Sequence, residues 1–429
     1  MKKIFTVLCA TLICASAMAQ EKKTENEASK DSGYVFTVKK ELPVTSVKNQ
    51  SNAGTCWCYS GLGFIEAELL RMGKGEYDLS EMFIVHHTYQ DRAAAAIRTH
   101  GDVSFSQGGA FSDVIYGMKH YGLVPESEMR PGVMYGDTLS NHSELSALTD
   151  AMVKAVASGK MKKLQSNKQH ELLSAKAISA VHDVYLGTCP EKFNYKGVEY
   201  TPKSFYESTG LNADDYVSIT SYTHHPFYEQ FVLEIQDNWR WSLSYNVTLD
   251  EMMEIMDNAI ANDYPVAWGS DVSEQGFRMG VRKGFCVLPA TDGNGTVAPG
   301  SDMSHWTGMT GQQMQDEAAK HPTPQRWVNQ DERQEAYDNW ETTDDHGMLI
   351  YGTATDQLGN EYYMVKNSWG DYGDYHGMFY ASKAFVRYKT MNIVVHKDAI
   401  PDAIKAKLGI ESSSAKKGNT TSKKGGKKK

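Results

Sequence analysis

Residues 50–57 of the chain read QSNAGTCW and combine a cysteine with the start of a predicted helix. After Cys56, apolar residues recur at helical spacing as far as Gly73, and Thr55 is placed to cap the helix. A cysteine reacts as its thiolate, and the N-terminus of a helix stabilises that negative charge. Gln50 can aim its side-chain NH₂ at an oxyanion that forms beside the sulfur. The stretch indicates a nucleophilic cysteine; a buried structural cysteine at a helix start is the alternative.

Two apolar runs near the C-terminus, residues 348–355 and 362–366, are predicted to form a hairpin. The five residues between them, 356–360, include a glycine and suit a hairpin loop. His346 stands just before the first strand and Asn367 just after the second. The two side chains are therefore expected to meet across the ladder.

This meeting gives His346 a chemical role. The Asn367 amide oxygen can accept the imidazole N–H, which fixes the tautomer whose other nitrogen faces a thiol. Trp369 is placed to shield that hydrogen bond from water. A single histidine is more often an ordinary loop residue. Combined with Cys56, however, His346 and Asn367 predict a nucleophile, a base and a group that orients the base.

The three motifs together resemble the papain-like cysteine peptidases, which carry Gln-x₅-Cys-Trp, Asp-His-Gly and Asn-Ser-Trp-Gly in this order. Leu79-Ser80-Glu81 is also similar to that family, and the resemblance covers roughly residues 40–130 and 265–400. It implies acyl transfer on peptide substrates without a cofactor. The residues that it implies are Cys56, His346, Asn367 and Gln50 for catalysis, Gly108, Gly109, Trp57 and Asp345 for substrate binding, and Trp369 for support.

Two departures are typical of the bleomycin hydrolase and aminopeptidase C branch. The gap from Cys56 to His346 is 290 residues, and the short stretch before Gln50 leaves no room for an inhibitory propeptide. The resemblance to this branch implies a homo-oligomer, most often a hexamer, with active sites that face an internal chamber. It also implies that C-terminal residues enter the cleft and restrict cleavage to free N-termini. We therefore expect an arm ending near Glu411–Ser414 in the cleft, with the lysines beyond it in solvent.

The expected fold class is α+β, a papain-like fold with a large helical insertion. We expect a helical subdomain with the nucleophile over 34–134, a largely separate helical insertion over 135–245, and a β-sheet subdomain over 246–411. Within the insertion, residues 140–159 and 170–186 place apolar side chains on one helical face.

The two ends of the chain differ from its body. Residues 1–19 have a basic start, an apolar run and a small-x-small site, which predicts a cleaved signal and export to the periplasm or the extracellular space. Residues 20–33 are a polar linker, and 412–429 form a lysine-rich tail. Nine of the chain's lysines lie in 1–19 and 415–429, so the total charge of −9 leaves −18 on residues 20–414. This acidic body argues against nucleic acid as a required partner, and no later stretch is apolar enough for a membrane span.

No metal or cofactor is predicted. The adjacent pairs His86-His87 and His224-His225 point apart on a regular element, so they make poor metal sites. Cys189 and Cys286 can be bridged or free, and the sequence leaves both open.

The favoured function is a cysteine aminopeptidase. The alternatives are an endopeptidase of the same fold, a non-catalytic peptide-binding homologue, and a polyanion-binding protein led by its lysine tail.

Overall fold

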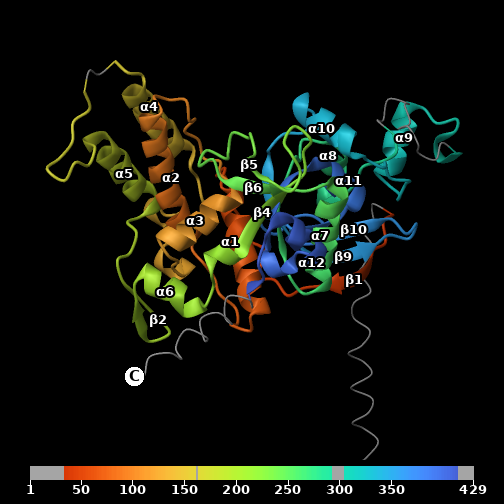
Figure 1. Ribbon diagram of the computed structural model, residues 1–429, viewed down its shortest axis with the longest axis horizontal. Coiled ribbons are helices and arrows are strands. Elements are labelled where there is room, and N and C mark those ends of the chain that lie inside the picture. Colours follow the sequence, from red (N-terminus) through yellow and green to blue (C-terminus); the bar gives the residue numbers. More distant parts are fainter. Residues whose placement is uncertain (1–32, 161–162, 292–303, 414–429) are drawn as a thin grey trace, which may run out of the picture.

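The computed structural model describes residues 33–160, 163–291 and 304–413. Helices α2–α6 gather on one side of the molecule, and a long sheet with α7–α12 forms the other side (Figure 1). Helix α1 lies where the two sides meet, in contact with α2, α3 and strand β9. None of the helices in these ranges has both the length and the apolar composition that a bilayer crossing needs.

The helices are α1 (Cys56–Arg71), α2 (Glu81–Arg98), α3 (Phe111–His120), α4 (Ser143–Ala157), α5 (Leu173–Leu186), α6 (Pro202–Thr209), α7 (Leu249–Ala261), α8 (Gln275–Gly280), α9 (Gly311–Ala318), α10 (Gln330–Asp338), α11 (Lys383–Lys389) and α12 (Asp402–Leu408). The strands are β1 (Thr37–Glu41), β2 (Phe193–Tyr195), β3 (Val198–Tyr200), β4 (Tyr216–Thr220), β5 (Gln230–Val232), β6 (Leu243–Asn246), β7 (Val266–Ser270), β8 (Phe285–Cys286), β9 (His346–Thr355), β10 (Glu361–Lys366), β11 (Met378–Ser382) and β12 (Thr390–His396).

Helix α1 is buried on all sides. Every residue from Trp57 to Leu69 is buried, including Glu66 and Glu68, so other parts of the chain cover α1 around its whole circumference. A Cβ on Gly61 would lie 2.7 Å from a Val114 methyl, so this glycine lets α1 and α3 approach closely. The predicted helix is confirmed, but the predicted cap is wrong, because the Thr55 side chain makes no capping hydrogen bond.

The main sheet has the strand order β5-β6-β4-β12-β7-β9-β10-β11-β8, with β1 also paired to β9. Most neighbouring strands are antiparallel. The expected hairpin is confirmed: β9 and β10 are antiparallel, and residues 356–360 join them. His346 is therefore the first residue of β9, and Asn367 directly follows β10.

The two faces of the sheet pack against different cores. Side chains alternate between the faces of a strand. On one face, Ala267, Leu349 and Val394 join the apolar cluster around α1, α2 and α3. Their neighbours in the chain turn to the opposite face and join the cluster around α7: Val266, Trp268, Met348, Ile350, Ile393 and Val395. This central sheet is buried on both sides, so the strand ends that carry His346 and Asn367 rest on a rigid base.

Residues 135–245 are not a separate helical insertion throughout. Helices α4 and α5 lie on the outer side of α2, as expected of an insertion (Figure 1). Strands β4, β5 and β6, however, extend the main sheet through the pairing of β4 with β12. The boundary predicted at residue 245 is therefore wrong, and the loop between β5 and β6 is brought to the centre of the molecule.

Candidate active site

Cys56 is the first residue of α1 and is partly exposed, whereas Cys58 is buried with its thiol directed at the Glu81 carbonyl, 3.6 Å away. Burial against the cleft walls raises the pKa of the Cys56 thiol to about 11. The backbone N–H groups of Gly347 and Trp57 hydrogen-bond the sulfur and act against this rise in pKa. The same two donors favour a thiolate when it forms.

His346 lies against Asn367 as the hairpin predicted. The His346 Nε2 and Asn367 Oδ1 are 2.7 Å apart. Asn367 Nδ2 donates to the Tyr372 hydroxyl at 2.8 Å, and the Ser368 N–H donates to Asn367 Oδ1, so this oxygen is an acceptor. His346 therefore carries its proton on Nε2, and Nδ1 has a free lone pair for a thiol proton. The Trp369 ring lies 4.9 Å from the imidazole, centroid to centroid, and shields this hydrogen bond.

Cys56 and His346 line the same cleft. Burial lowers the pKa of His346 to about 4, and the hydrogen bond to Asn367 partly offsets this fall. Burial thus opposes a charge on either residue alone. Transfer of the thiol proton to His346 creates both charges at once and leaves the net charge of the pair unchanged, so burial opposes the transfer far less.

Gln50 is fixed by three hydrogen bonds. Its backbone N–H donates to the Ser368 carbonyl at 2.8 Å, and its Oε1 accepts from the Ser368 hydroxyl at 2.7 Å. Its Nε2 donates to the Ala53 carbonyl at 2.8 Å. One amide hydrogen remains, and the first N–H groups of α1 have no partner within the helix. The predicted oxyanion donors, Gln50 Nε2 and the Cys56 N–H, are both available.

Gly109 lines the cleft, and Gly108 directly precedes it in the chain. Trp57 Nε1 donates to the Gln107 carbonyl at 3.0 Å, which ties this segment to the start of α1. A Cβ on Gly109 would lie 2.8 Å from the Trp57 ring, and a Cβ on Gly108 would overlap the carboxylate of Asp237. Only glycine fits at either position.

Asp237 and Asp344 complete the cleft, and neither was predicted. Both line it beside Cys56, and their charges act to raise the pKa of that thiol. Asp237 comes from the loop between β5 and β6, and Arg92 Nη1 holds it at 3.2 Å. Sequence patterns give no signal for Asp237, because it reaches the cleft only through the pairing of β4–β6 with the main sheet. Asp344 precedes the Asp-His-Gly motif, and this position is its only sequence signal.

Asp345, predicted to bind substrate, borders the cleft and also makes three hydrogen bonds within the protein. Its Oδ2 accepts from the N–H groups of Val272 and Ser273 at 3.2 and 3.1 Å, and its Oδ1 accepts from the Thr343 hydroxyl at 2.8 Å. Asp345 borders the cleft, but these bonds use its carboxylate to hold the chain after β7 beside His346.

The expected C-terminal arm does not enter the cleft over residues 411–413. The Ser413 N–H donates to Asp398 Oδ1 at 2.9 Å, and the Asp398 N–H bonds His396. His396 stacks on Tyr264, which in turn lies under Arg71, the last residue of α1. A helix of 16 residues is about 24 Å long, so this contact lies at the opposite end of α1 from the reactive thiol. Ser414 and the lysine-rich tail lie outside the described residues, as do residues 1–32.

Cys189 and Cys286 are free thiols, which decides the question left open by the sequence. The two adjacent histidine pairs each gain a third candidate metal ligand from another segment: Cys189 beside His86 and His87, and Glu234 beside His224 and His225. No cofactor site was predicted.

A pH effect on stability is expected from His142. It is buried, and burial lowers its pKa to about 4 from 6.5. Between about pH 4 and 6.5 the unfolded chain therefore binds up to one more proton than the folded chain, so His142 costs stability as the pH falls through this range. The free energy of unfolding, relative to a His142→Gln variant, should fall by about 1.4 kcal/mol per pH unit in this range.

Urea unfolding of both proteins between pH 7.5 and 4.5, with a chelator present, measures this difference. Comparison with the variant cancels the contributions of titrating groups that do not interact with His142. A difference that stays constant with pH would show that His142 titrates normally.

Known proteins resemble this chain over nearly its whole length. The model of the Peptidase C1-like family matches residues 6–286 and 325–415. Aminopeptidase C of Streptococcus thermophilus is 24% identical over 410 residues, covering 86% of this chain and 83% of the relative. Aminopeptidase G of Lactobacillus delbrueckii subsp. lactis is 22% identical, covering 83% of this chain and 82% of the relative.

A solved structure shares the fold. The crystal structure of PepW from Lactobacillus rhamnosis HN001 aligns with a TM-score of 0.64 at 18% identity, covering 93% of this chain and 92% of PepW.

Proposed function

Since the chain belongs to the Peptidase C1-like family and has the papain-like fold, we propose that this cysteine peptidase is an aminopeptidase that releases N-terminal residues from peptides. The relatives named aminopeptidase C and G support this function, and the shape and charge of the cleft support it independently.

The reaction uses Cys56 and His346, which line the cleft, together with Gln50. His346 Nδ1 takes the proton of Cys56 as the sulfur attacks the peptide carbonyl, and Gln50 Nε2 and the Cys56 N–H hold the oxyanion. His346 then returns the proton to the leaving amine as the peptide bond breaks. Water, activated by the same imidazole, releases the acyl group and restores the thiol.

Asp237 is the observation that carries the aminopeptidase assignment. An endopeptidase needs room for substrate on both sides of the scissile bond. Here the Asp237 carboxylate occupies the space directly over Gly108, in the segment expected to pair with the substrate backbone. The carboxylate blocks a longer chain at this point and offers a negative charge to a substrate that ends there. A free N-terminal ammonium matches that charge, whereas an acetylated or internal amide does not.

Asp344 strengthens this negative charge. Burial raises its pKa to about 7, with further contributions from the charges of Asp237 and Asp345. No hydrogen bond or ion pair to a described residue satisfies its carboxylate. A bound ammonium would relieve the repulsion between Asp237 and Asp344 and hold both in the ionised form.

The charge of Asp237 provides the test. In Asp237→Asn, which keeps the side-chain shape, kcat/KM for peptides with a free N-terminus should fall about 10–100-fold, the usual loss for a hydrogen bond to a charged group. Hydrolysis of the same peptides with an acetylated N-terminus should not fall. Steady-state kinetics on paired free and acetylated peptides measures both values.

Glu229→Gln is the matched control. Glu229 directly precedes β5, and the change removes one exposed negative charge outside the cleft. It should leave both rates unchanged. An equal loss on free and acetylated peptides in Asp237→Asn would assign Asp237 a structural role. Rapid cleavage of acetylated peptides by the unmodified enzyme would favour an endopeptidase.

We further propose that the protein is exported and assembles into a homo-oligomer. Export rests on the basic, apolar and small-residue pattern of residues 1–19. Assembly, with a hexamer as the expected form, rests on the resemblance to the bleomycin hydrolase and aminopeptidase C branch. Both remain predictions.

A further inference from the structure

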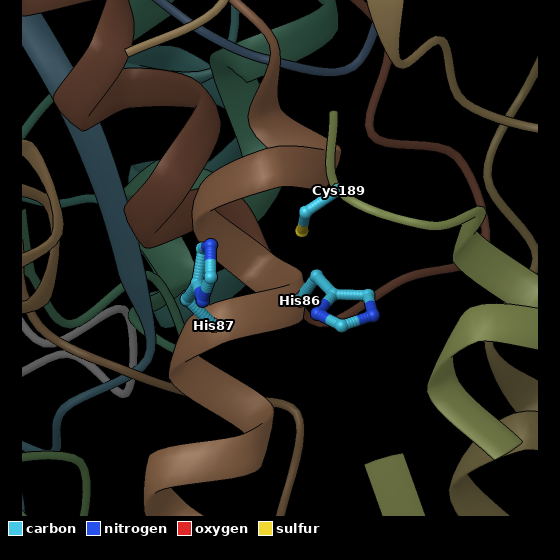
Figure 2. Close-up of side chains that lie close together, drawn as sticks. All are labelled: His86, His87 and Cys189. Atoms are coloured by element: carbon cyan, nitrogen blue, oxygen red, sulfur yellow. The ribbon is translucent and has the colours of Figure 1, made fainter. Parts of the chain in front are cut away.

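A second group of reactive side chains lies on the outer side of α2, apart from the catalytic cleft. His86 and His87 are on the second turn of this helix, and Cys189 lies in the segment that follows α5. One ligand atom from each residue lies within 4.8 Å of those of the other two. Figure 2 shows the Cys189 thiol directed toward the helical turn that carries both histidines.

His86 is prepared as a metal ligand. It is only 3% exposed, and its Nε2 lies 2.8 Å from Asp183 Oδ1. Its Nδ1 is buried and has no hydrogen-bond partner among the described residues. A carboxylate that accepts the Nε2 proton directs the lone pair to Nδ1, and this arrangement is common behind metal-bound histidines. The unpartnered Nδ1 therefore has a lone pair available to bind a metal ion.

We propose that His86, His87 and Cys189 bind a Zn²⁺ ion, with Asp183 orienting His86. The ligand set of two imidazoles and one thiolate suits a borderline-soft ion and does not suit Mg²⁺ or Ca²⁺, which take oxygen ligands. Tetrahedral zinc places such atoms about 3.3–3.7 Å apart, given bonds of about 2.0–2.3 Å. The present limit of 4.8 Å therefore requires side-chain movements of about an ångström.

Adjacent histidines alone make a poor metal site, but here Cys189 supplies a third ligand. Residues i and i+1 diverge on a helix, so His86 and His87 alone cannot close around an ion. Cys189 comes from a different segment and completes the set from above the helix. A bound ion would join α2 to the segment after α5.

The other histidine cluster lacks these features. His224 and His225 both direct Nε2 to the Glu234 carboxylate, at 3.0 and 2.8 Å, so their candidate ligand atoms already have partners. Glu234 is exposed. This cluster serves as a control.

The full chain carrying Cys56→Ala should be used for the test, because the catalytic thiol would otherwise bind zinc as well. After removal of metal in the presence of a reductant, we expect one equivalent of Zn²⁺ to bind in a calorimetric titration and to raise the melting temperature. Co²⁺ in place of Zn²⁺ should give a thiolate-to-metal absorption band. Adding Cys189→Ser should weaken Zn²⁺ binding at least tenfold and remove the Co²⁺ thiolate band.

Two variants separate the outcomes. His224→Gln should leave the affinity, the Co²⁺ band and the shift in melting temperature unchanged. Zn²⁺ binding that survives Cys189→Ser at full affinity, binding that is lost in His224→Gln, or the absence of binding would each overturn the proposal. The readouts do not depend on peptidase activity, so failure here leaves the proposed function intact.

Discussion

The Cys56→Ala variant is expected to lose peptide hydrolysis by on the order of 10⁶-fold while keeping its fold, as nucleophile removal does in peptidases that work by acyl transfer. Cys56 opens a buried helix whose start is held by its neighbours, including Trp57 through its bond to the Gln107 carbonyl. Loss of one sulfur at a partly exposed position leaves that framework in place. Single-turnover assays with a sensitive fluorogenic peptide, together with circular dichroism, measure activity and fold.

Cys58→Ala is the matched control, because the chain offers a second thiol two residues away. Cys58 is fully buried and faces the carbonyl of Glu81, away from the cleft. Its removal should lower stability slightly and leave kcat unchanged. Full activity in Cys56→Ala would contradict the nucleophile assignment, and equal inactivity of both folded variants would point to disturbed packing of α1.

The pairing of His346 with Asn367 could be predicted from sequence because its geometry is local. A five-residue loop joins β9 and β10, and their antiparallel pairing brings His346 at the start of β9 against Asn367 just after β10. The capping box at the start of α7, Thr248 with Glu251, is a similarly local pattern. Both depend on residues a few positions or one hairpin apart.

Asp237, which we propose selects for a free N-terminus, could not be placed in the cleft from sequence. Asp237 reaches Gly108 only because β4–β6 join the main sheet through β12, a pairing across more than 170 residues. The strands β5 and β6 span only three and four residues and lie among aromatic and polar loops, so no periodicity marks them. Short strands that depend on distant partners leave little local signal.

The C-terminus shows the limit of inference by resemblance. An arm in the cleft follows from the branch that the chain resembles, but residues 411–413 are held at Asp398, at the far end of α1. We propose that Asp237, which Arg92 holds in place, supplies in this chain the charge expected from the arm. A similar selectivity is thus expected from a different part of the chain.

The Gln50→Ala variant is expected to lower kcat by about 10²–10³-fold, the usual loss for one oxyanion-hole donor, with a much smaller change in KM. The structure gives this side chain a fixed direction: Ser368 holds Oε1 and Ala53 holds one hydrogen of Nε2. The remaining hydrogen is directed before substrate arrives, so little reorganisation accompanies oxyanion formation. Gln50→Glu should lose as much activity as Gln50→Ala, because a carboxylate cannot donate.

Ser368→Ala tests the orientation of Gln50. It leaves the Gln50 donor in place but removes the hydroxyl bond of 2.7 Å that fixes Oε1, so the backbone bond and the Ala53 carbonyl alone hold the side chain. We expect an intermediate loss of about fivefold in kcat, since a single neutral hydrogen bond contributes roughly 1 kcal/mol. Steady-state kinetics on one free-amino peptide measures all three variants. If the losses appear in KM with kcat intact, Gln50 positions the substrate and the oxyanion is held by other donors.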